Sequence, residues 1–287
     1  MRIRKPSMAS KRTRISAKAP VIGGKQYHID CEPGDVARYV LLPGDPARVG
    51  KIASNWDTRK EIASHREYHT MTGTYKKVPL SCTSTGIGAP SLAIGVDELS
   101  RIGADTFIRV GSTGALQKGM HLGDLVITTG AVRLDGASKD FVIPEYPAVA
   151  NYEVVMALIE AAEELKAPYH VGITASTDTF YTGQSRPALD GYMPSFKERV
   201  LEDMQKARVL NFEMESGCLL TMASIFEKRA GAVCFVVANR ATDEFRITDE
   251  MAVRAGKVAS HAIYLLSLWD EKKRKRKKSY LFPSLFS

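Results

Sequence analysis

Apolar and polar positions follow two different periods along the chain. Residues 39–42 and 231–238 form nearly continuous apolar runs, as expected of strands buried on both faces of a sheet. Residues 90–101 and 249–269 instead repeat their apolar side chains at helical spacing. By the same criteria we expect strands at 106–110, 124–133 and 170–176, a hairpin over 67–85 that turns between residues 73 and 79, and helices at 46–54, 151–165, 195–207 and 215–228. This alternation predicts one α/β domain with helices on both faces of its sheet.

One of the expected strands carries a charge. Arg109 lies in the apolar run that starts at Phe107, and the run ends in Gly111-Ser112-Thr113-Gly114, which we interpret as a turn. An unpaired guanidinium in a buried strand is costly, so Arg109 needs a negatively charged partner. The turn adds backbone N–H groups and two hydroxyls at the end of the strand where open α/β sheets bind ligands. The partner is therefore a bound anion or a structural carboxylate, and this segment alone favours neither.

The net charge of +8 comes from the two ends of the chain. Residues 1–20 contain seven basic side chains and no acidic one, and residues 270–278 contain seven basic side chains and two acidic ones. Without these segments, the 40 basic and 32 acidic residues become 26 and 30, which leaves a net charge of −4. We therefore expect a folded domain over 27–269, a flexible basic tail over 1–26 and a basic C-terminal tail over 270–287. Such tails can bind nucleic acid, but solvated tails are the simpler interpretation.

Composition narrows the protein class further. No apolar run approaches the roughly 20 residues of a membrane helix, and the first twenty residues lack the apolar core of a secretory signal. Four cysteines are widely spaced and form no Cys-x-x-Cys pair, which favours buried reduced thiols over a zinc site: Cys31, Cys82, Cys218 and Cys234. We therefore expect the protein to be located in the cytoplasm.

Two glycine-containing turns precede expected helices. Neither the turn at 43–48 nor that at 84–91 has the spacing of a nucleotide triphosphate or dinucleotide loop. Gly44 followed by Arg48 instead suits a small anion, because a backbone N–H and a guanidinium lie one helical turn apart. A plain turn with a surface arginine is the alternative. Arg66 beside Glu67 offers another guanidinium, with a surface ion pair as the simpler interpretation.

Two later segments offer groups for a ring and a sugar. Gln184 can donate and accept, and Arg186 can only donate, so together they complement the carbonyl, N–H and carbonyl edge of uracil. Phe180 could pack against the ring, although a polar loop with one packed aromatic has the same pattern. Glu215 lies near an expected helix N-terminus, where its carboxylate can accept hydrogen bonds from two ribose hydroxyls or act as a helix cap.

These segments together resemble the uridine phosphorylases of the nucleoside phosphorylase superfamily. The resemblance runs from about His28 to about residue 268 and rests on eight short motifs in order: 43–46, 64–67, 84–91, 109–115, 132–138, 178–186, 213–216 and 237–240. Each motif is common alone, but eight in this order are specific. The resemblance implies a single-domain, three-layer α/β fold with a mixed twisted central sheet. It also implies reversible phosphorolysis of uridine to uracil and ribose 1-phosphate, in a homodimer that shares its active sites or in a hexamer.

The resemblance also implies roles for individual residues. The phosphate ligands would be Gly44, Arg48, Arg109 and Ser112, with Arg66 from the neighbouring subunit. The ribose would contact Met214 and Glu215, and its 5′-hydroxyl would contact a neighbouring His28. Uracil would contact Phe180, Gln184 and Arg186, with Arg240 supporting Arg186 through water. The catalytic residues would be Arg109, Gln184, Arg186 and Glu215. No cofactor is implied besides a structural potassium ion at Glu67, Ile87 and Ser91.

The chain departs from the family pattern at three positions. Ser112 replaces a frequent threonine and keeps the hydroxyl, Thr182 replaces a frequent proline, and Phe212 replaces a frequent tyrosine. Purine-specific relatives have an aspartate near the position of Asn239, so this chain favours a pyrimidine. A purine nucleoside phosphorylase or a nucleosidase on the same fold, and a nucleic-acid-binding protein acting through its tails, are the alternatives.

Overall fold

The computed structural model describes residues 16–285. The strands are β1 Val21–Ile22, β2 Lys25–Gln26, β3 Tyr39–Leu42, β4 Thr58–His65, β5 Tyr68–Tyr75, β6 Val78–Thr83, β7 Thr106–Ala115, β8 Leu125–Leu134, β9 Ala148–Val149, β10 Tyr169–Thr177, β11 Asn211–Glu213, β12 Arg229–Asn239 and β13 Glu244–Phe245. The α-helices are α1 Ala47–Ala53, α2 Ala89–Arg101, α3 Tyr152–Glu164, α4 Ser195–Glu198, α5 Val200–Lys206, α6 Ser216–Ile225 and α7 Asp249–Lys275. Short 3-10 helices are η1 Ala137–Asp140, η2 Thr182–Gln184, η3 Leu189–Gly191 and η4 Pro283–Leu285.

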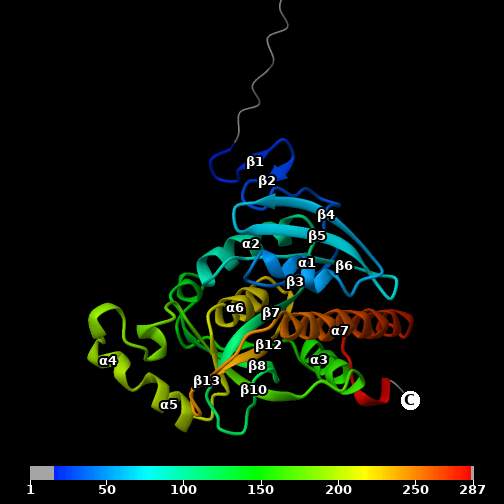
Figure 1. The fold of residues 1–287 in the computed structure, drawn as a ribbon. Coiled ribbons are helices and arrows are strands. Elements are labelled where there is room, and N and C mark those ends of the chain that lie inside the picture. Colours follow the sequence, from blue (N-terminus) through cyan, green and yellow to red (C-terminus); the bar gives the residue numbers. More distant parts are fainter. Residues whose placement is uncertain (1–15, 286–287) are drawn as a thin grey trace, which may run out of the picture.

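A mixed sheet forms the centre of the molecule (Figure 1). Within residues 16–285 it has eleven strands, in the order β13-β12-β8-β10-β11-β7-β3-β6-β5-β4, with β9 beside β8. A further pairing between β12 and β7 closes β12, β8, β10, β11 and β7 into a ring. β7 is the hub of the sheet, since it pairs in parallel with β3 and β12 and antiparallel with β11.

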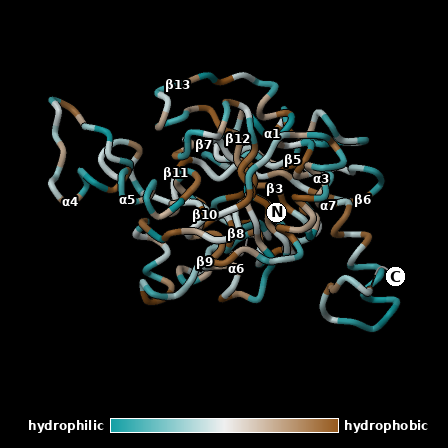
Figure 2. The backbone as a smooth tube through the Cα atoms, turned by 90° about the horizontal axis from the view of Figure 1, so that it is seen from below, coloured by the Kyte–Doolittle hydropathy of each residue, from teal (hydrophilic) through white to brown (hydrophobic). Residues whose placement is uncertain are grey.

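Alternation along the strands directs side chains to two separate cores. In β3, Leu41 packs into the core beneath α1, α3 and α7, whereas Leu42 packs into the core beneath α2 and α6. In β7, Ile108 and Phe107 divide in the same way. Helices therefore cover both faces of the sheet, which confirms the predicted fold. The apolar segments are concentrated in these central strands (Figure 2).

The sheet has an opening along one edge of β7, where the candidate functional site lies. β3 pairs with β7 only as far as Leu42 opposite Arg109, and β11 joins the same edge only at Phe212 opposite Gly114. Residues 110–113 therefore have no strand partner on that edge. The turn predicted at 111–114 is wrong, because β7 continues through it in register with β12 on its other edge.

Most predicted elements are present, with two other differences. Residues 195–207 form two helices, α4 and α5, which are separated at Arg199 with φ −97° and ψ −1°. These helices project from the body in both views (Figures 1 and 2). The hairpin turns at Lys76 and Lys77, both with positive φ, and a third strand, β4, extends it on the other side of β5.

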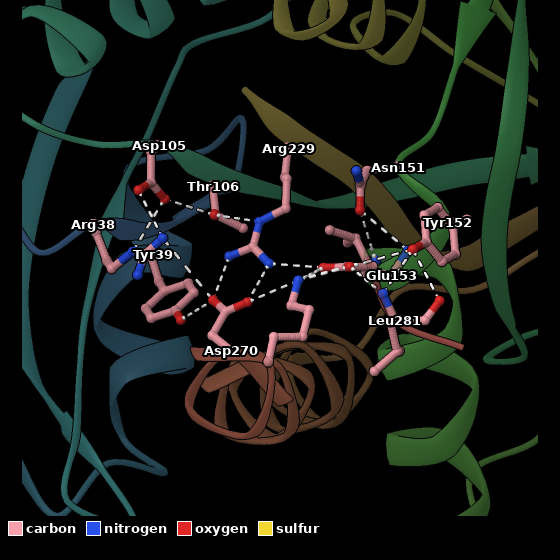
Figure 3. Close-up of polar contacts among 12 residues, drawn as sticks. Arg38, Tyr39, Asp105, Thr106, Asn151, Tyr152, Glu153, Arg229, Asp270 and Leu281 are labelled. Carbon is pink, nitrogen blue, oxygen red and sulfur yellow. Dashed lines mark hydrogen bonds and ion pairs between the residues drawn. The ribbon is translucent and has the colours of Figure 1, made fainter. Parts of the chain in front are cut away.

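The C-terminal segment differs from the solvated tail predicted for 270–287. α7 continues to Lys275, and Leu281 and Leu285 are buried in the core. Asp270 accepts hydrogen bonds from both terminal nitrogens of Arg229, at 2.9 and 2.7 Å, and the Lys273 ammonium lies 2.6 Å from a carboxylate oxygen of Glu153 (Figure 3). The basic run is therefore partly folded, because buried carboxylates neutralise it.

At the other end, residues 21–26 form the small β1–β2 hairpin, so this part of the predicted flexible tail is ordered. The remainder of the basic N-terminal tail, residues 1–15, lies outside the described residues. Across residues 16–285, no helix combines the length and apolar content needed to cross a membrane.

Candidate functional site

A cavity of about 600 Å³ lies at the opening along β7. Its walls come from the loop after β3, from β7, from the loop after β10, from the β11–α6 junction and from the end of β12 with β13. The cavity brings together ten of the residues predicted to bind phosphate, ribose or uracil: Gly44, Arg48, Arg109, Ser112, Phe180, Gln184, Arg186, Met214, Glu215 and Arg240. Segments far apart in the sequence therefore converge on one space.

Arg109 is held between two carboxylates. Its Nε donates to Glu213 Oε2 at 2.7 Å, and its Nη2 forms a close ion pair with Glu215. Burial alone would lower the pKa of Arg109, but Glu215 and Glu213 outweigh this effect and raise it above the ordinary arginine value. Nη1 is buried and has no hydrogen-bond partner within residues 16–285. The arginine thus has the structural carboxylate that the sequence allowed and also keeps donors for a ligand.

Arg48 and Ser112 lie beside this free donor. Arg48 Nη2 is 3.3 Å from Ser112 Oγ, and its Nε is 3.8 Å from Asp45. Burial lowers the pKa of Arg48; Asp45 opposes the shift, and the positive charge of Arg109 adds to it. Two buried guanidinium groups facing one cavity would be stabilised by an anion between them.

A close backbone approach explains the glycine at this end of the cavity. A Cβ on Gly44 would lie 3.0 Å from the carbonyl oxygen of Gly86. A side chain at position 44 would therefore force apart the two glycine-containing turns that were singled out in the sequence.

Glu215 faces the middle of the cavity. Its carboxylate accepts from the backbone N–H of Gly88 at 2.6 Å and of Met214 at 3.2 Å. Burial raises the pKa of Glu215, and the Arg109 guanidinium opposes the shift. Glu215 is the N-cap residue of α6, as the alternative had it, but its side chain makes no cap hydrogen bond.

Glu213 makes the cap hydrogen bonds of α6, and the sequence analysis did not predict this role. Its buried carboxylate accepts from the backbone N–H of Glu215 at 3.0 Å and of Ser216 at 2.9 Å, and also binds the Ser176 hydroxyl. A signal was available: Arg109 needed a carboxylate, and Glu213 follows an apolar strand two residues before Glu215. Glu213 fixes both the start of α6 and the orientation of Arg109.

The opposite end of the cavity contains the predicted base-reading pair. Arg186 Nη1 donates to Gln184 Oε1 at 2.6 Å, and Gln184 Nε2 donates to Thr177 Oγ1 at 3.1 Å. The amide therefore keeps one N–H and one oxygen lone pair for a ligand. The Arg186 guanidinium lies 4.0 Å from the Phe180 ring centroid, so it covers one face of that aromatic ring.

Arg240 supports this end in a different way from the one expected. Its Nη1 donates to the backbone carbonyl of Gln184 at 3.0 Å, so it holds Gln184 directly. Burial lowers the pKa of Arg186 to about 10, and the charge of Arg240 contributes. A further wall segment at Asp243–Phe245 was not predicted, because its polar sequence resembles an ordinary loop.

His28 and Arg66 lie outside this cavity and beside each other. Arg66 Nη2 donates to the Tyr27 hydroxyl at 3.1 Å, and the Tyr27 and His28 rings are 4.7 Å apart, edge to face. The simple Arg66–Glu67 surface pair is not formed among the described residues.

The residues expected to bind potassium adjoin the cavity. A Cβ on Gly86 would lie 3.0 Å from Glu67 Cγ and 3.1 Å from Ser91 Oγ, and Ile87 lines the cavity. Among residues 16–285 there is no cluster of three or more His, Cys, Asp or Glu side chains suited to a metal.

Comparison with known proteins agrees with this geometry. The family model described as phosphorylase superfamily matches residues 38–268. A uridine phosphorylase of Thermococcus kodakarensis is 59% identical over 272 residues, which cover 94% of this chain and 98% of that protein. A uridine phosphorylase of Escherichia coli is 42% identical over 84% of this chain and 94% of its own length. A guanosine phosphorylase of Halorubrum lacusprofundi is 40% identical over 75% of this chain and 84% of its own length. With most of its length matched by the family model and by these relatives, the chain belongs to the phosphorylase superfamily.

Proposed function

We propose that this enzyme catalyses the reversible phosphorolysis of uridine to uracil and ribose 1-phosphate. The observation that carries the proposal is that Arg109, whose Nη1 is buried and unpartnered among residues 16–285, lines a cavity together with Arg48 and Ser112. Inorganic phosphate is the small anion that fits these donors. The names of the relatives from Thermococcus and Escherichia support the same reaction.

The reaction follows from the order of groups along the cavity. A phosphate oxygen attacks C1′ of the ribose, and the C1′–N1 bond breaks with its electron pair passing to uracil. The phosphate stabilises positive charge on the ribose, while Gln184 and Arg186 stabilise negative charge on the departing ring. Glu215 accepts hydrogen bonds from the ribose hydroxyls. No covalent intermediate with the enzyme is needed.

A pyrimidine is the preferred base. Asn239 Nδ2 donates to the backbone carbonyls of Gln117 at 3.2 Å and Met120 at 2.7 Å, and its Oδ1 accepts from Ala241 N at 2.8 Å. The side chain is therefore occupied by backbone groups, and no acid at this position protonates a purine. The guanosine phosphorylase relative makes guanosine the second candidate substrate.

We also propose that two copies share each site. His28 and Arg66 both contact Tyr27, and neither lines the cavity of its own chain, as expected if both reach a neighbouring one. Glu67, Ile87 and Ser91 would supply one carboxylate, one carbonyl and one hydroxyl to a potassium ion, a set of hard oxygens that suits such a cation and is completed by a second copy. The four cysteines are buried and unpaired, which suits the reducing cytoplasm.

The deciding experiment follows uridine absorbance with and without phosphate. Phosphate-dependent release of uracil, and not of guanine from guanosine, is the expected result. Release of uracil at the same rate in phosphate-free buffer would indicate a nucleosidase, and faster turnover of guanosine would favour the second candidate.

A further inference from the structure

Glu98 of α2 holds the segment that contains His28. The Glu98 side chain is 9% exposed, and its carboxylate makes four contacts with two consecutive residues. Oε2 accepts from the backbone N–H of His28 and of Ile29, both at 3.0 Å, while Oε1 lies 2.6 Å from His28 Nδ1 and 3.3 Å from His28 N. One carboxylate therefore fixes both the backbone and the ring of His28.

This contact determines which ring nitrogen carries hydrogen. A carboxylate that already accepts two backbone N–H groups acts as an acceptor, so His28 Nδ1 must be the donor. In the neutral imidazole the other nitrogen, Nε2, then has a free lone pair. Nε2 has no hydrogen-bond partner among residues 16–285, and the ring is half-buried beside Tyr27.

We infer that Glu98 is a positioning residue that makes His28 Nε2 an acceptor for the ribose 5′-hydroxyl in the neighbouring subunit's site. The inference rests on the proposed function. Without Glu98 the ring can rotate or adopt the other tautomer, in which Nε2 is a donor.

The neighbouring groups hold the segment from other sides. His65 Nδ1 lies 2.9 Å from the backbone carbonyl of His28, and Tyr27 contacts the ring edge. Neither reaches a ring nitrogen of His28. Of the described residues around His28, Glu98 is thus the one with a contact that selects the tautomer.

The test measures how well each variant distinguishes uridine from 5′-deoxyuridine, as the ratio of their kcat/KM values. We expect His28→Ala and Glu98→Ala each to lower this ratio about fivefold, the value of one ordinary hydrogen bond. The double variant should lower it no further, because both changes remove the same contact. Glu98→Gln keeps an oxygen that can accept from Nδ1 and should restore part of the ratio. The KM for phosphate should stay unchanged in all of them.

Asp97→Ala is the matched control. Asp97 lies on the same helix and pairs with Arg101 at 2.9 Å, so the variant removes an equal charge without touching His28. Its substrate ratio should equal that of the wild-type enzyme. An unchanged ratio in Glu98→Ala, additive losses in the double variant, or dissociation of the assembly in Glu98→Ala would each overturn the inference. Lack of phosphate-dependent turnover by the wild-type enzyme would instead refute the proposed function.

Discussion

Replacing Arg109 by lysine separates its charge from its geometry. The three guanidinium nitrogens differ in their partners: Nε contacts Glu213, Nη2 contacts Glu215, and Nη1 is buried with no hydrogen-bond partner among residues 16–285. A lysine ammonium keeps the positive charge between the carboxylates but is a single point, so it cannot reproduce this fork. The variant should fold, because it avoids the roughly 3–5 kcal/mol cost of leaving buried charges unpaired.

The loss in kcat/KM should be much larger than the loss in stability. One preorganised donor to a developing charge is worth about 2.7–4 kcal/mol, so kcat/KM for phosphate should fall about 10²–10³-fold. The assay is uracil formation from saturating uridine over a range of phosphate concentrations, together with thermal unfolding of the same samples.

Arg229→Lys is the control for this prediction. Arg229 also lies between two carboxylates, with Nη1 3.1 Å from Glu153 and Nη2 2.7 Å from Asp270. It begins β12 opposite Thr106, whereas Arg109 is opposite Ala232, and it does not line the cavity. We expect a lower melting temperature and kinetic constants within about twofold of the wild-type values. A folded Arg109→Lys enzyme within threefold of wild-type kcat/KM, or an equal loss in Arg229→Lys, would refute the assignment.

Three further predictions test other parts of the site. Burial raises the pKa of Glu215, so kcat/KM for uridine should fall with decreasing pH already above the ordinary glutamate pKa of 4.5. Glu215→Gln should remove this acidic fall, and a profile of kcat/KM measured from pH 4 to 8 tests both results. Mixing inactive Arg66→Ala and Arg109→Ala proteins should restore activity in hybrid assemblies, and hybrids that form without activity would exclude a shared site. Ending the chain after Lys278 removes two buried leucines worth about 1.5–3 kcal/mol each, so thermal unfolding should shift to lower temperature while kcat/KM is unchanged; a loss of turnover in the folded variant would contradict this.

The spacing of apolar residues predicted the elements whose buried face is apolar, but it failed where the buried face carries charged side chains. The predicted end of α7 at residue 269 follows the last apolar residue, Trp269, yet Lys273 lies one turn further on the same face. Its ammonium is buried because Glu153 on α3 neutralises it, at 2.6 and 2.7 Å. No local pattern reports a carboxylate that is 120 residues away in the sequence.

Most residues that line the cavity could be named from sequence motifs, but their arrangement could not be predicted. The sequence indicated that Arg109 needs a negative partner and that Glu215 faces a ligand. It could not show that Glu213 orients Arg109, because this depends on β11 joining β7 only after the opening in the sheet. The opening itself arises from where β3 ends, which is a property of strand pairing in three dimensions.

A buried arginine does not by itself mark the functional site in this fold. The distinguishing feature is an arginine that has a buried donor without a hydrogen-bond partner. At one end of the β7–β12 pair, Arg229 donates from all three nitrogens, to Thr106, Glu153 and Asp270 (Figure 3). Such a saturated cluster joins helices to strands and has no capacity for a ligand. Further along the same pair, where Arg109 is opposite Ala232, Arg109 also has two carboxylate partners but keeps Nη1 without a partner among residues 16–285. Because an unused buried donor is costly, the second arrangement is stable only where a ligand regularly completes it.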